Sequence, residues 1–253
     1  MPGSPAAAPA RFDLLFPFQW PPSPIRPDPI TTKPSASPPV IPMNQTSILL
    51  ATSNPDKQQA FRRLLEGLPL DLVTPQDLNL TSVPEEQGDN HHDVARSKAQ
   101  VWSQTGSMLA VASDGGLVIP VLGGDWQSLY THRFAGDMAT DAGRVHGLIE
   151  LLKPYRDAER QASWIESLAI AHRGRVLASW QVRGATGVIS ENAPAETLST
   201  HGFWAFSLWE FPQLGKSYRQ LSPRELESLD DHWFRLGRLV RRFFHSHFVT
   251  PAQ

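Results

Sequence analysis

Short apolar runs and amphipathic segments alternate along the chain from about residue 45 onward. The run at 48–51 is uninterrupted, which is typical of a buried β-strand. A helix should follow at once, because Ser53 or Asn54 can cap its first turn and Pro55 suits its first helical position. The patterned part of the chain therefore begins with a strand, a tight turn and a helix.

The same two periodicities predict the remaining elements. Apolar strands are expected at 70–73, 108–112, 117–121, 162–171, 175–182 and 186–190. Helices are expected near 92–104, from Thr140 or Asp141 to about 152, from Ser222-Pro223, and near 231–247. The segments around Arg173-Gly174 should form an antiparallel hairpin, and the glycines of 113–116 favour a sharp turn that puts Asp114 at a strand end. Strands and helices that alternate in this way predict an α/β domain with a mixed sheet.

Residues 1–44 lack both patterns and hold more than half of the 23 prolines in the chain. Proline fixes φ and removes a backbone donor, so we expect an extended or disordered tail followed by one domain at 45–250. An apolar island at 12–20 could dock on the domain or on a partner, or it could remain unstructured. Translation from Met43 is a further alternative, because the first strand begins almost directly after it.

Composition and charge limit the possible functions. The 253 residues are 40% hydrophobic and 19% charged, which suits a globular protein with a sizeable core. A net charge of −2 gives no general attraction to nucleic acid polymers or anionic membranes, so phosphate binding requires a local cluster. The absence of cysteine excludes disulfides, thiolate metal sites and cysteine nucleophiles, and it fits a cytoplasmic protein. No apolar run approaches the roughly 20 residues that span a bilayer.

The polar turn Thr52-Ser53-Asn54-Pro55-Asp56-Lys57 is a candidate phosphate site. Exposed amides, the positive end of a helix dipole and the Lys57 ammonium group would all favour an anion there. A strand followed by a capped helix is also a common structural unit, so the turn alone does not establish a site.

Glu86 and Asp114 form a candidate metal pair, with Lys98 on the helix between them. Mg²⁺ prefers hard oxygen ligands and often bridges one or two carboxylates to substrate phosphates. The alternative is that these acids are ordinary solvated surface groups.

Several motifs follow one another in a familiar order. They are Asn54 and Lys57 after a strand, Glu86 and Gly88 before a helix with Ala95-Arg96-Ser97-Lys98-Ala99, Ser113-Asp114-Gly115-Gly116-Leu117, Leu122-Gly123-Gly124, Tyr130-Thr131-His132-Arg133-Phe134-Ala135-Gly136 and Ala139-Thr140-Asp141. In order and spacing they resemble the inosine/xanthosine triphosphate pyrophosphatase family. The resemblance extends over most of the chain after residue 45.

This resemblance implies a two-lobed α/β homodimer with a central cleft. It also implies Mg²⁺-dependent hydrolysis of a nucleoside triphosphate to the monophosphate and pyrophosphate. By position, the substrate would contact Thr52, Asn54, Lys57, Lys98, Gly115, Phe203 and His232. Glu86 and Asp114 would hold the metal, and Asp114, with Lys57 as the second catalytic residue, would orient or deprotonate the attacking water.

The chain departs from the family at both ends of the implied site. Asp93-Val94 replaces a Glu-Asn pair, and Ser113-Asp114 replaces paired acids, so one acid on the metal side is missing. At the base end the family motif Phe-Gly-Tyr-Asp-Pro is replaced by Phe203-Trp204-Ala205-Phe206-Ser207, Ser-His-Arg by Asp231-His232-Trp233, and a lysine by Glu227. The aromatic residues could stack on a base without reading its edge, or they could fill the cleft as core. His232 could be a helix cap.

Other motifs are weaker. Gly215-Lys216-Ser217 resembles the end of a phosphate loop, but Glu210 stands where such a loop requires glycine. The pair His91-His92 with Asp93 could suggest a transition-metal site, yet adjacent helical side chains point about 100° apart. Arg235, Arg238, Arg241 and Arg242 are expected on a solvated helix face.

Three functions therefore remain open. The first is a Mg²⁺-dependent nucleoside-triphosphate diphosphatase with relaxed or altered base preference. The second is a catalytically silent relative that binds a nucleotide or a protein partner with a filled pocket. The third is a phosphatase that acts on another phosphorylated metabolite.

Overall fold

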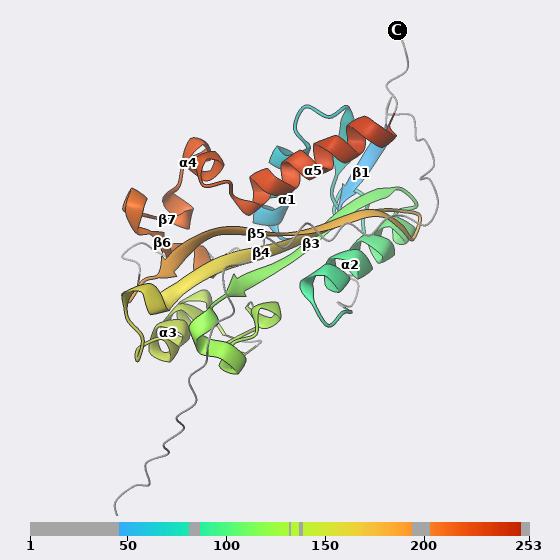
Figure 1. The fold of residues 1–253 in the computed structure, drawn as a ribbon. Coiled ribbons are helices and arrows are strands. Elements are labelled where there is room, and N and C mark those ends of the chain that lie inside the picture. Colours follow the sequence, from blue (N-terminus) through green and yellow to red (C-terminus); the bar gives the residue numbers. More distant parts are fainter. Residues whose placement is uncertain (1–45, 81–86, 132, 137–138, 194–202, 249–253) are drawn as a thin grey trace, which may run out of the picture.

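A seven-stranded mixed sheet runs through the molecule (Figure 1). The computed structural model describes residues 46–80, 87–131, 133–136, 139–193 and 203–248. The strand order is β2-β1-β3-β4-β5-β6-β7, and β1 is parallel to both of its neighbours whereas the later pairings are antiparallel. The strands are β1 (Thr46–Leu50), β2 (Leu70–Val73), β3 (Leu109–Val118), β4 (Gln161–His172), β5 (Arg175–Ile189), β6 (Trp209–Phe211) and β7 (Lys216–Ser217). The expected mixed α/β sheet is confirmed.

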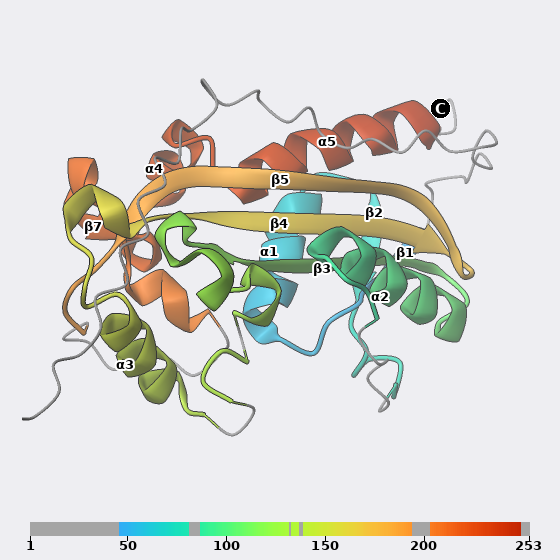
Figure 2. The same cartoon turned by 60° about the horizontal axis from the view of Figure 1, so that its bottom comes forward.

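Helices cover both faces of this sheet. They are α1 (Pro55–Leu65), α2 (His91–Thr105), α3 (Asp141–Leu151), α4 (Pro223–Ser228) and α5 (His232–His247). Figures 1 and 2 show α1 and α5 on one face and α2 on the other, with α3, α4, β6 and β7 around the far end of the β4–β5 hairpin. These positions agree with the helices that the sequence predicts.

Polar side chains fix the starts of these helices as expected. Asn54, Thr140 and Ser222 are the N-caps of α1, α3 and α4, and the side chain of each accepts a hydrogen bond from a backbone N–H in the first turn. The α5 cap is Asp231 rather than His232, which is the first residue inside the helix. The alternative that His232 acts as a cap is therefore wrong.

The buried apolar residues divide the domain into two lobes. In the first lobe, Phe61 of α1 and Val240 of α5 pack on one face of β1 and β3, and Trp102 of α2 packs on the other face. In the second lobe, Leu148 of α3 packs with Trp164 of β4 and with the segment that follows β5. Because β3 and β4 contribute residues to both lobes, the two lobes share one sheet.

The expected turn at 113–116 is wrong, because β3 continues through it. All ten residues of β3 are paired with β4, so Asp114 lies inside a strand rather than at its end. The two glycines permit close approach instead of a turn. A Cβ atom at Gly115 would overlap the Glu166 carboxylate, and one at Gly116 would overlap the carbonyl oxygen of Ser128.

Other differences are smaller. The predicted strand at 186–190 is the end of β5, and the short strands β6 and β7 were not foreseen. The proline-rich segment lies outside the described residues, so the disordered tail and the domain limits of 45–250 stay predictions. Within the described ranges, none of the helices combines the length and apolar character that crossing a membrane requires.

Candidate functional site

The site begins where β1 ends and β3 continues. The parallel register of these strands stops at Leu50 and Val111, so the next part of β3 faces the turn after β1 and the start of α1. Lys57, in the first turn of α1, reaches this edge, and its Nζ lies 3.3 Å from the carbonyl oxygen of Ser113. The strand end and the helix start therefore meet beside the middle of β3.

The turn between β1 and α1 is held by its own side chains. Asn54 Oδ1 accepts hydrogen bonds from the backbone N–H groups of Asp56, at 2.9 Å, and Lys57, at 3.2 Å. The hydroxyl oxygen of Thr52 accepts a hydrogen bond from the N–H of Asn54 at 3.1 Å. These contacts direct the positive end of the α1 dipole toward the site, which suits an anionic ligand.

Asp114 lies on the face of β3 that is turned toward α2, away from α1. Lys98 Nζ lies 3.3 Å from Asp114 Oδ1, and His91 Nδ1 lies 2.6 Å from Oδ2. His91 Nε2 is in turn 3.1 Å from the Ser128 hydroxyl oxygen. Both carboxylate oxygens of Asp114 are thus held by cationic or hydrogen-bonding groups on one side.

The charge state of Asp114 follows from these neighbours. Burial alone would raise the pKa of its carboxyl group, but the hydrogen bond from His91 and the charges of Lys57 and Lys98 outweigh burial. The pKa of Asp114 is therefore below its usual value, and the group is ionised at neutral pH. The side chains of Lys57, Lys98 and Asp114 are 16%, 16% and 15% exposed, so a ligand can still reach them.

Glu166 is a second acid in this region, and the sequence analysis did not identify it. It lies on β4 directly opposite Gly115, and its side chain is fully buried. Glu166 Oε2 accepts a hydrogen bond of 2.7 Å from Trp164 Nε1, while Oε1 lies 3.7 Å from Lys57 Nζ. Side chains alternate along a strand, so Glu166, Ser113 and Gly115 share the α1 face whereas Asp114 faces α2.

The remaining sequence candidates are Glu86 and the pair His91-His92. Glu86 lies outside the described residues, so its place at the metal site stays a prediction. His91 and His92 point apart as expected, because His92 Nε2 lies 3.0 Å from the Ser179 hydroxyl oxygen while His91 contacts Asp114. Among the residues described, no group of three or more His, Cys, Asp or Glu side chains is arranged to hold a metal ion.

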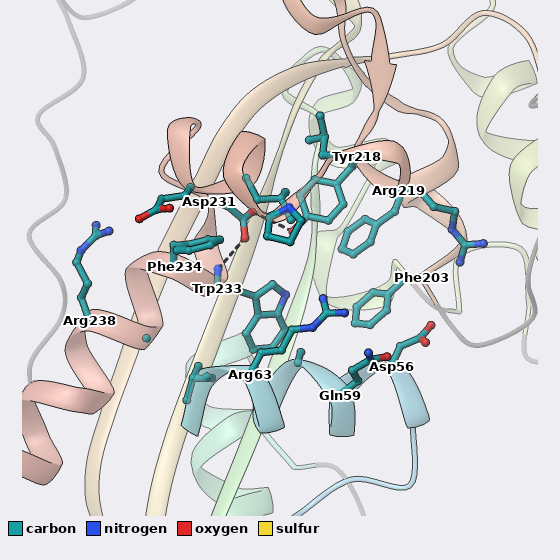
Figure 3. A pocket seen from close by; sticks show the side chains of 18 of the residues that line it. Asp56, Gln59, Arg63, Phe203, Tyr218, Arg219, Asp231, Trp233, Phe234 and Arg238 are labelled. Carbon is teal, nitrogen blue, oxygen red and sulfur yellow. Dashed lines mark hydrogen bonds between the residues drawn. The ribbon is translucent and has the colours of Figure 1, made fainter. Parts of the chain in front are cut away.

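A pocket of about 570 Å³ lies between the two lobes (Figure 3). One wall is the flank of α1, and the opposite wall is the start of α5 with aromatic residues from the second lobe. Its lining includes Asp56, Gln59, Arg63, Phe203, Phe206, Tyr218, Glu227, Asp231, Trp233, Phe234 and Arg238. The same helix α1 therefore supplies both the Lys57 turn and one wall of this pocket.

Aromatic rings dominate the deep side of the pocket. Phe203 and Phe206 stack with centroids 4.7 Å apart and planes within 4°, and Trp164 packs edge-on against Phe206. Phe203 and Phe206 are more than nine-tenths buried, yet both line the pocket. They are chiefly core residues that leave a small apolar surface for a ligand.

The Asp231 carboxylate at the start of α5 is already paired within the protein. Asp231 accepts hydrogen bonds of 3.0 Å from the Tyr218 hydroxyl and from the Trp233 N–H, and its Oδ1 lies 2.7 Å from His232 Nδ1. Burial would raise the pKa of Asp231, but His232 and these hydrogen bonds hold that pKa below its usual value. His232 is fully buried and is not one of the pocket-lining residues, and its ring packs against those of Tyr218 and Trp233.

Other predicted polar motifs have structural partners. Lys216 lies 2.7 Å from Glu225, which agrees with the expectation that Gly215-Lys216-Ser217 is no phosphate loop. Arg235 and Arg238 both pair with Asp230 at the surface. The helix-face prediction for these two arginines is confirmed.

The site therefore combines predicted and unforeseen residues. Lys57, Lys98 and Asp114 converge as the sequence predicts, and Thr52, Asn54 and Gly115 lie beside them. Ser128 and Glu166 were not predicted, and His91 was considered only as part of a transition-metal motif. Glu166 left a usable signal, since it is a single charged residue within the apolar run 162–171.

Comparison with known sequences identifies the relatives of this chain. The model of the Ham1 family matches residues 48–227. The dITP/XTP pyrophosphatase of Acinetobacter baylyi is 30% identical over 206 residues, which cover 79% of this chain and 93% of that protein. The dITP/XTP pyrophosphatase of Escherichia coli K12 is 30% identical over 183 residues, 72% of this chain and 90% of its own.

Solved structures share the fold. A HAM1 protein from Coxiella burnetii superimposes with a TM-score of 0.64 at 23% identity, over 78% of this chain and 100% of its own. A nucleoside-triphosphatase / dITP/XTP pyrophosphatase from Mycobacterium abscessus has a TM-score of 0.56 at 23% identity, over 78% and 98% of the two chains. Since the family model and the fold both extend over most of the chain, this protein belongs to the Ham1 family.

Proposed function

We propose that this protein hydrolyses nucleoside triphosphates, including those of inosine and xanthosine, to the nucleoside monophosphate and pyrophosphate. The observation that carries the proposal is the convergence of Lys57, Lys98 and Asp114 on the part of β3 beyond the end of β1. Relatives at 30% identity are named dITP/XTP pyrophosphatases, which supports the same activity here.

The phosphate groups would lie between α1 and α2. The first-turn amides of α1 and the Lys57 ammonium group face this region from one side, and Lys98 faces it from the other. Two lysines and a helix N-terminus would face the phosphate oxygens there, although the chain as a whole is slightly acidic and each lysine also pairs with a carboxylate.

The carboxylate of Asp114 fits Mg²⁺, because it is a hard oxygen donor that stays ionised and is partly accessible. We propose Asp114 and Glu86 as the protein ligands. When bound, the ion would offset charge on the phosphates and make a coordinated water more acidic. Asp114 is also the residue proposed to orient the attacking water. Its lowered pKa makes it a weak base, so orientation rather than proton abstraction would be its main contribution.

The nucleoside would occupy the pocket between the lobes. Trp233 and Phe203 offer aromatic surfaces to a flat ring. The Asp231 carboxylate, which could otherwise read a base edge, is already hydrogen-bonded to Tyr218 and Trp233. We therefore propose that the base is held by stacking, with relaxed preference among bases.

Release of pyrophosphate tests the proposal directly. The purified protein would be incubated with inosine, xanthosine, adenosine and guanosine triphosphates, with Mg²⁺ or with a chelator. We expect Mg²⁺-dependent pyrophosphate and the matching monophosphate. Orthophosphate as the product would instead support a phosphatase that acts on another metabolite.

The second candidate is a silent relative that binds a nucleotide without turnover. The observation that favours it is the aromatic filling of the pocket, where Phe203 and Phe206 are almost fully buried. Calorimetric binding of inosine triphosphate with no product of any kind, at every Mg²⁺ concentration tested, would support this candidate over the first.

We also propose a homodimer, as the family resemblance implies. Sedimentation equilibrium should then give twice the chain mass of 28.1 kDa. A particle with the mass of one chain at micromolar concentration would contradict this proposal.

A further inference from the structure

Glu166 is the most unusual charged residue in the structure. It lies in the middle of β4 with no exposed surface, and within the described part of the chain the Trp164 indole is the hydrogen-bond donor to Oε2. Oε1 has no hydrogen-bond partner among the described residues, and a cation, Lys57 Nζ, lies 3.7 Å away. A carboxylate removed from water at this cost normally requires a compensating charge.

The surrounding chain is built to accept this carboxylate. Gly115 lies directly opposite Glu166, and any Cβ at that position would overlap Glu166 Oε2. Ser113, two residues earlier on the same face of β3, keeps a buried hydroxyl without a partner in the described structure. The space for the Glu166 side chain therefore depends on glycine at 115, and small residues line this face of the strand.

We propose that Glu166 is a positioning residue that holds Lys57 at the phosphate end of the site. Lys57 Nζ lies between the carbonyl oxygen of Ser113, at 3.3 Å, and Glu166 Oε1, at 3.7 Å. These two acceptors lie on the β3–β4 side of the ammonium group, so a remaining proton can point to a phosphate oxygen. The inference rests on the proposed function, since it assigns Lys57 to the triphosphate.

The arrangement also sets the charge of the site. Lys98 pairs with Asp114 on one face of β3, and Lys57 pairs with Glu166 on the other. Two cations and two carboxylates cancel, so each lysine is held in place without a net positive charge inside the protein. Without the Glu166 carboxylate, the Lys57 side chain should remain in the site but lose its fixed position.

Thermal unfolding tests the pairing without reference to activity. Glu166→Gln keeps an acceptor for the Trp164 indole and removes the buried charge, whereas Lys57→Met leaves the Glu166 charge uncompensated. We expect Lys57→Met to lower Tm by an amount on the order of 5 °C, and the double variant to recover most of this loss. Additive shifts in Tm would overturn the pairing.

Steady-state pyrophosphate release tests the positioning role. With inosine triphosphate and Mg²⁺, Glu166→Gln should lower kcat about tenfold, whereas in the Lys57→Met background it should change kcat less than about twofold. Glu150→Gln is the matched control, because Glu150 pairs with Lys153 at the exposed surface. It should leave Tm and kcat unchanged.

The possible failures are distinguishable. If the unaltered protein releases no pyrophosphate, the proposed function fails, while the unfolding experiment still decides whether Lys57 and Glu166 are coupled. If the protein is active and Glu166→Gln has the same effect in both backgrounds, or no effect at all, the positioning role is wrong and the proposed function stands.

Discussion

At the scale of single residues, the neighbours of Asp114 determine the ionisation of its carboxyl group. The carboxylate contacts His91 and Lys98, and the positive charge of Lys57 also acts on it. Together these groups lower the pKa of Asp114 despite its burial. It is held from one side by groups of α2, and it remains partly exposed. Such a carboxylate can bind a cation or accept a hydrogen bond from a water while it stays ionised at neutral pH.

Replacement of Asp114 by asparagine should abolish most of the activity. We expect Asp114→Asn to lower kcat/KM for inosine triphosphate roughly 10²- to 10³-fold, because the variant loses a charge at the reacting centre. Asp71→Asn on the exposed side of β2 is the matched control and should leave kcat/KM unchanged. Full activity of Asp114→Asn would show that another residue orients the water.

Asp114 should also contribute to the pH dependence of stability. Its folded pKa is below the reference value of 3.8, so its stabilising contribution is complete well above pH 3.8. The contribution falls as the pH drops below that value and through the folded pKa. Urea midpoints measured between pH 6 and pH 2 should therefore decline less steeply in Asp114→Asn than in the unaltered protein. Equal slopes would contradict the assigned ion pairs.

At the scale of elements, α1 links the two ends of the site. Its capped N-terminus and Lys57 face β3, while its flank with Gln59 and Arg63 forms a wall of the pocket. A helix this short is rigid, so any shift of its first turn would move both regions together. The proposed site therefore depends on the Asn54 cap for the position of both regions.

Two helix caps allow these roles to be separated. Asn54 and Thr140 both accept first-turn hydrogen bonds, so Asn54→Ala and Thr140→Ala should each destabilise the protein by about 1 kcal/mol, or about 2–4 °C in Tm. Asn54→Ala alone should also raise the Kd for inosine triphosphate roughly fivefold, which equals about 1 kcal/mol. Calorimetric titration would measure this difference, and equal affinities of the two variants would contradict it.

The elements also show how far the sequence could lead. Periodicity and capping residues located α1, α2, α3 and α5 correctly, because each has a cap or an apolar face that local physics dictates. Gly115-Gly116 misled the prediction, since glycine marks both tight turns and close packing, and only the partner strand distinguishes them. Glu166 was missed because its role depends on Lys57 and Gly115, which are distant in sequence.

At the scale of the whole molecule, the lobes divide the chemistry. The first lobe provides the lysines, Asp114 and Trp233, and the second provides the aromatic residues Phe203, Phe206 and Tyr218 of the pocket. The order of the motifs along the sequence predicted the lysines and Asp114. The pocket could not be predicted in the same way, because the bond between Asp231 and Tyr218 and the burial of Phe203 and Phe206 depend on tertiary contacts that local sequence does not show.

This division predicts weak discrimination among bases. Values of kcat/KM for inosine, xanthosine, adenosine and guanosine triphosphates should lie within about tenfold of one another, whereas a site that reads base edges discriminates by roughly 10⁴. Trp233→Ala should weaken the binding of all four substrates by a similar amount, about 1–3 kcal/mol if a base stacks on the indole. A preference of roughly 10⁴ for one base would contradict stacking alone and would show that polar lining residues such as Gln59, Arg63 or Glu227 contact the base edge.

The uninterrupted course of β3 has an evolutionary consequence. Asp114 pairs with Lys98 on one face of this strand. Gly115, the next residue, leaves room on the other face for Glu166, which pairs with Lys57. A one-residue insertion or deletion upstream within this strand would turn every following side chain to the wrong face. Insertions and deletions within β3 should therefore be absent from any descendant that keeps both pairs, and glycine should persist at position 115.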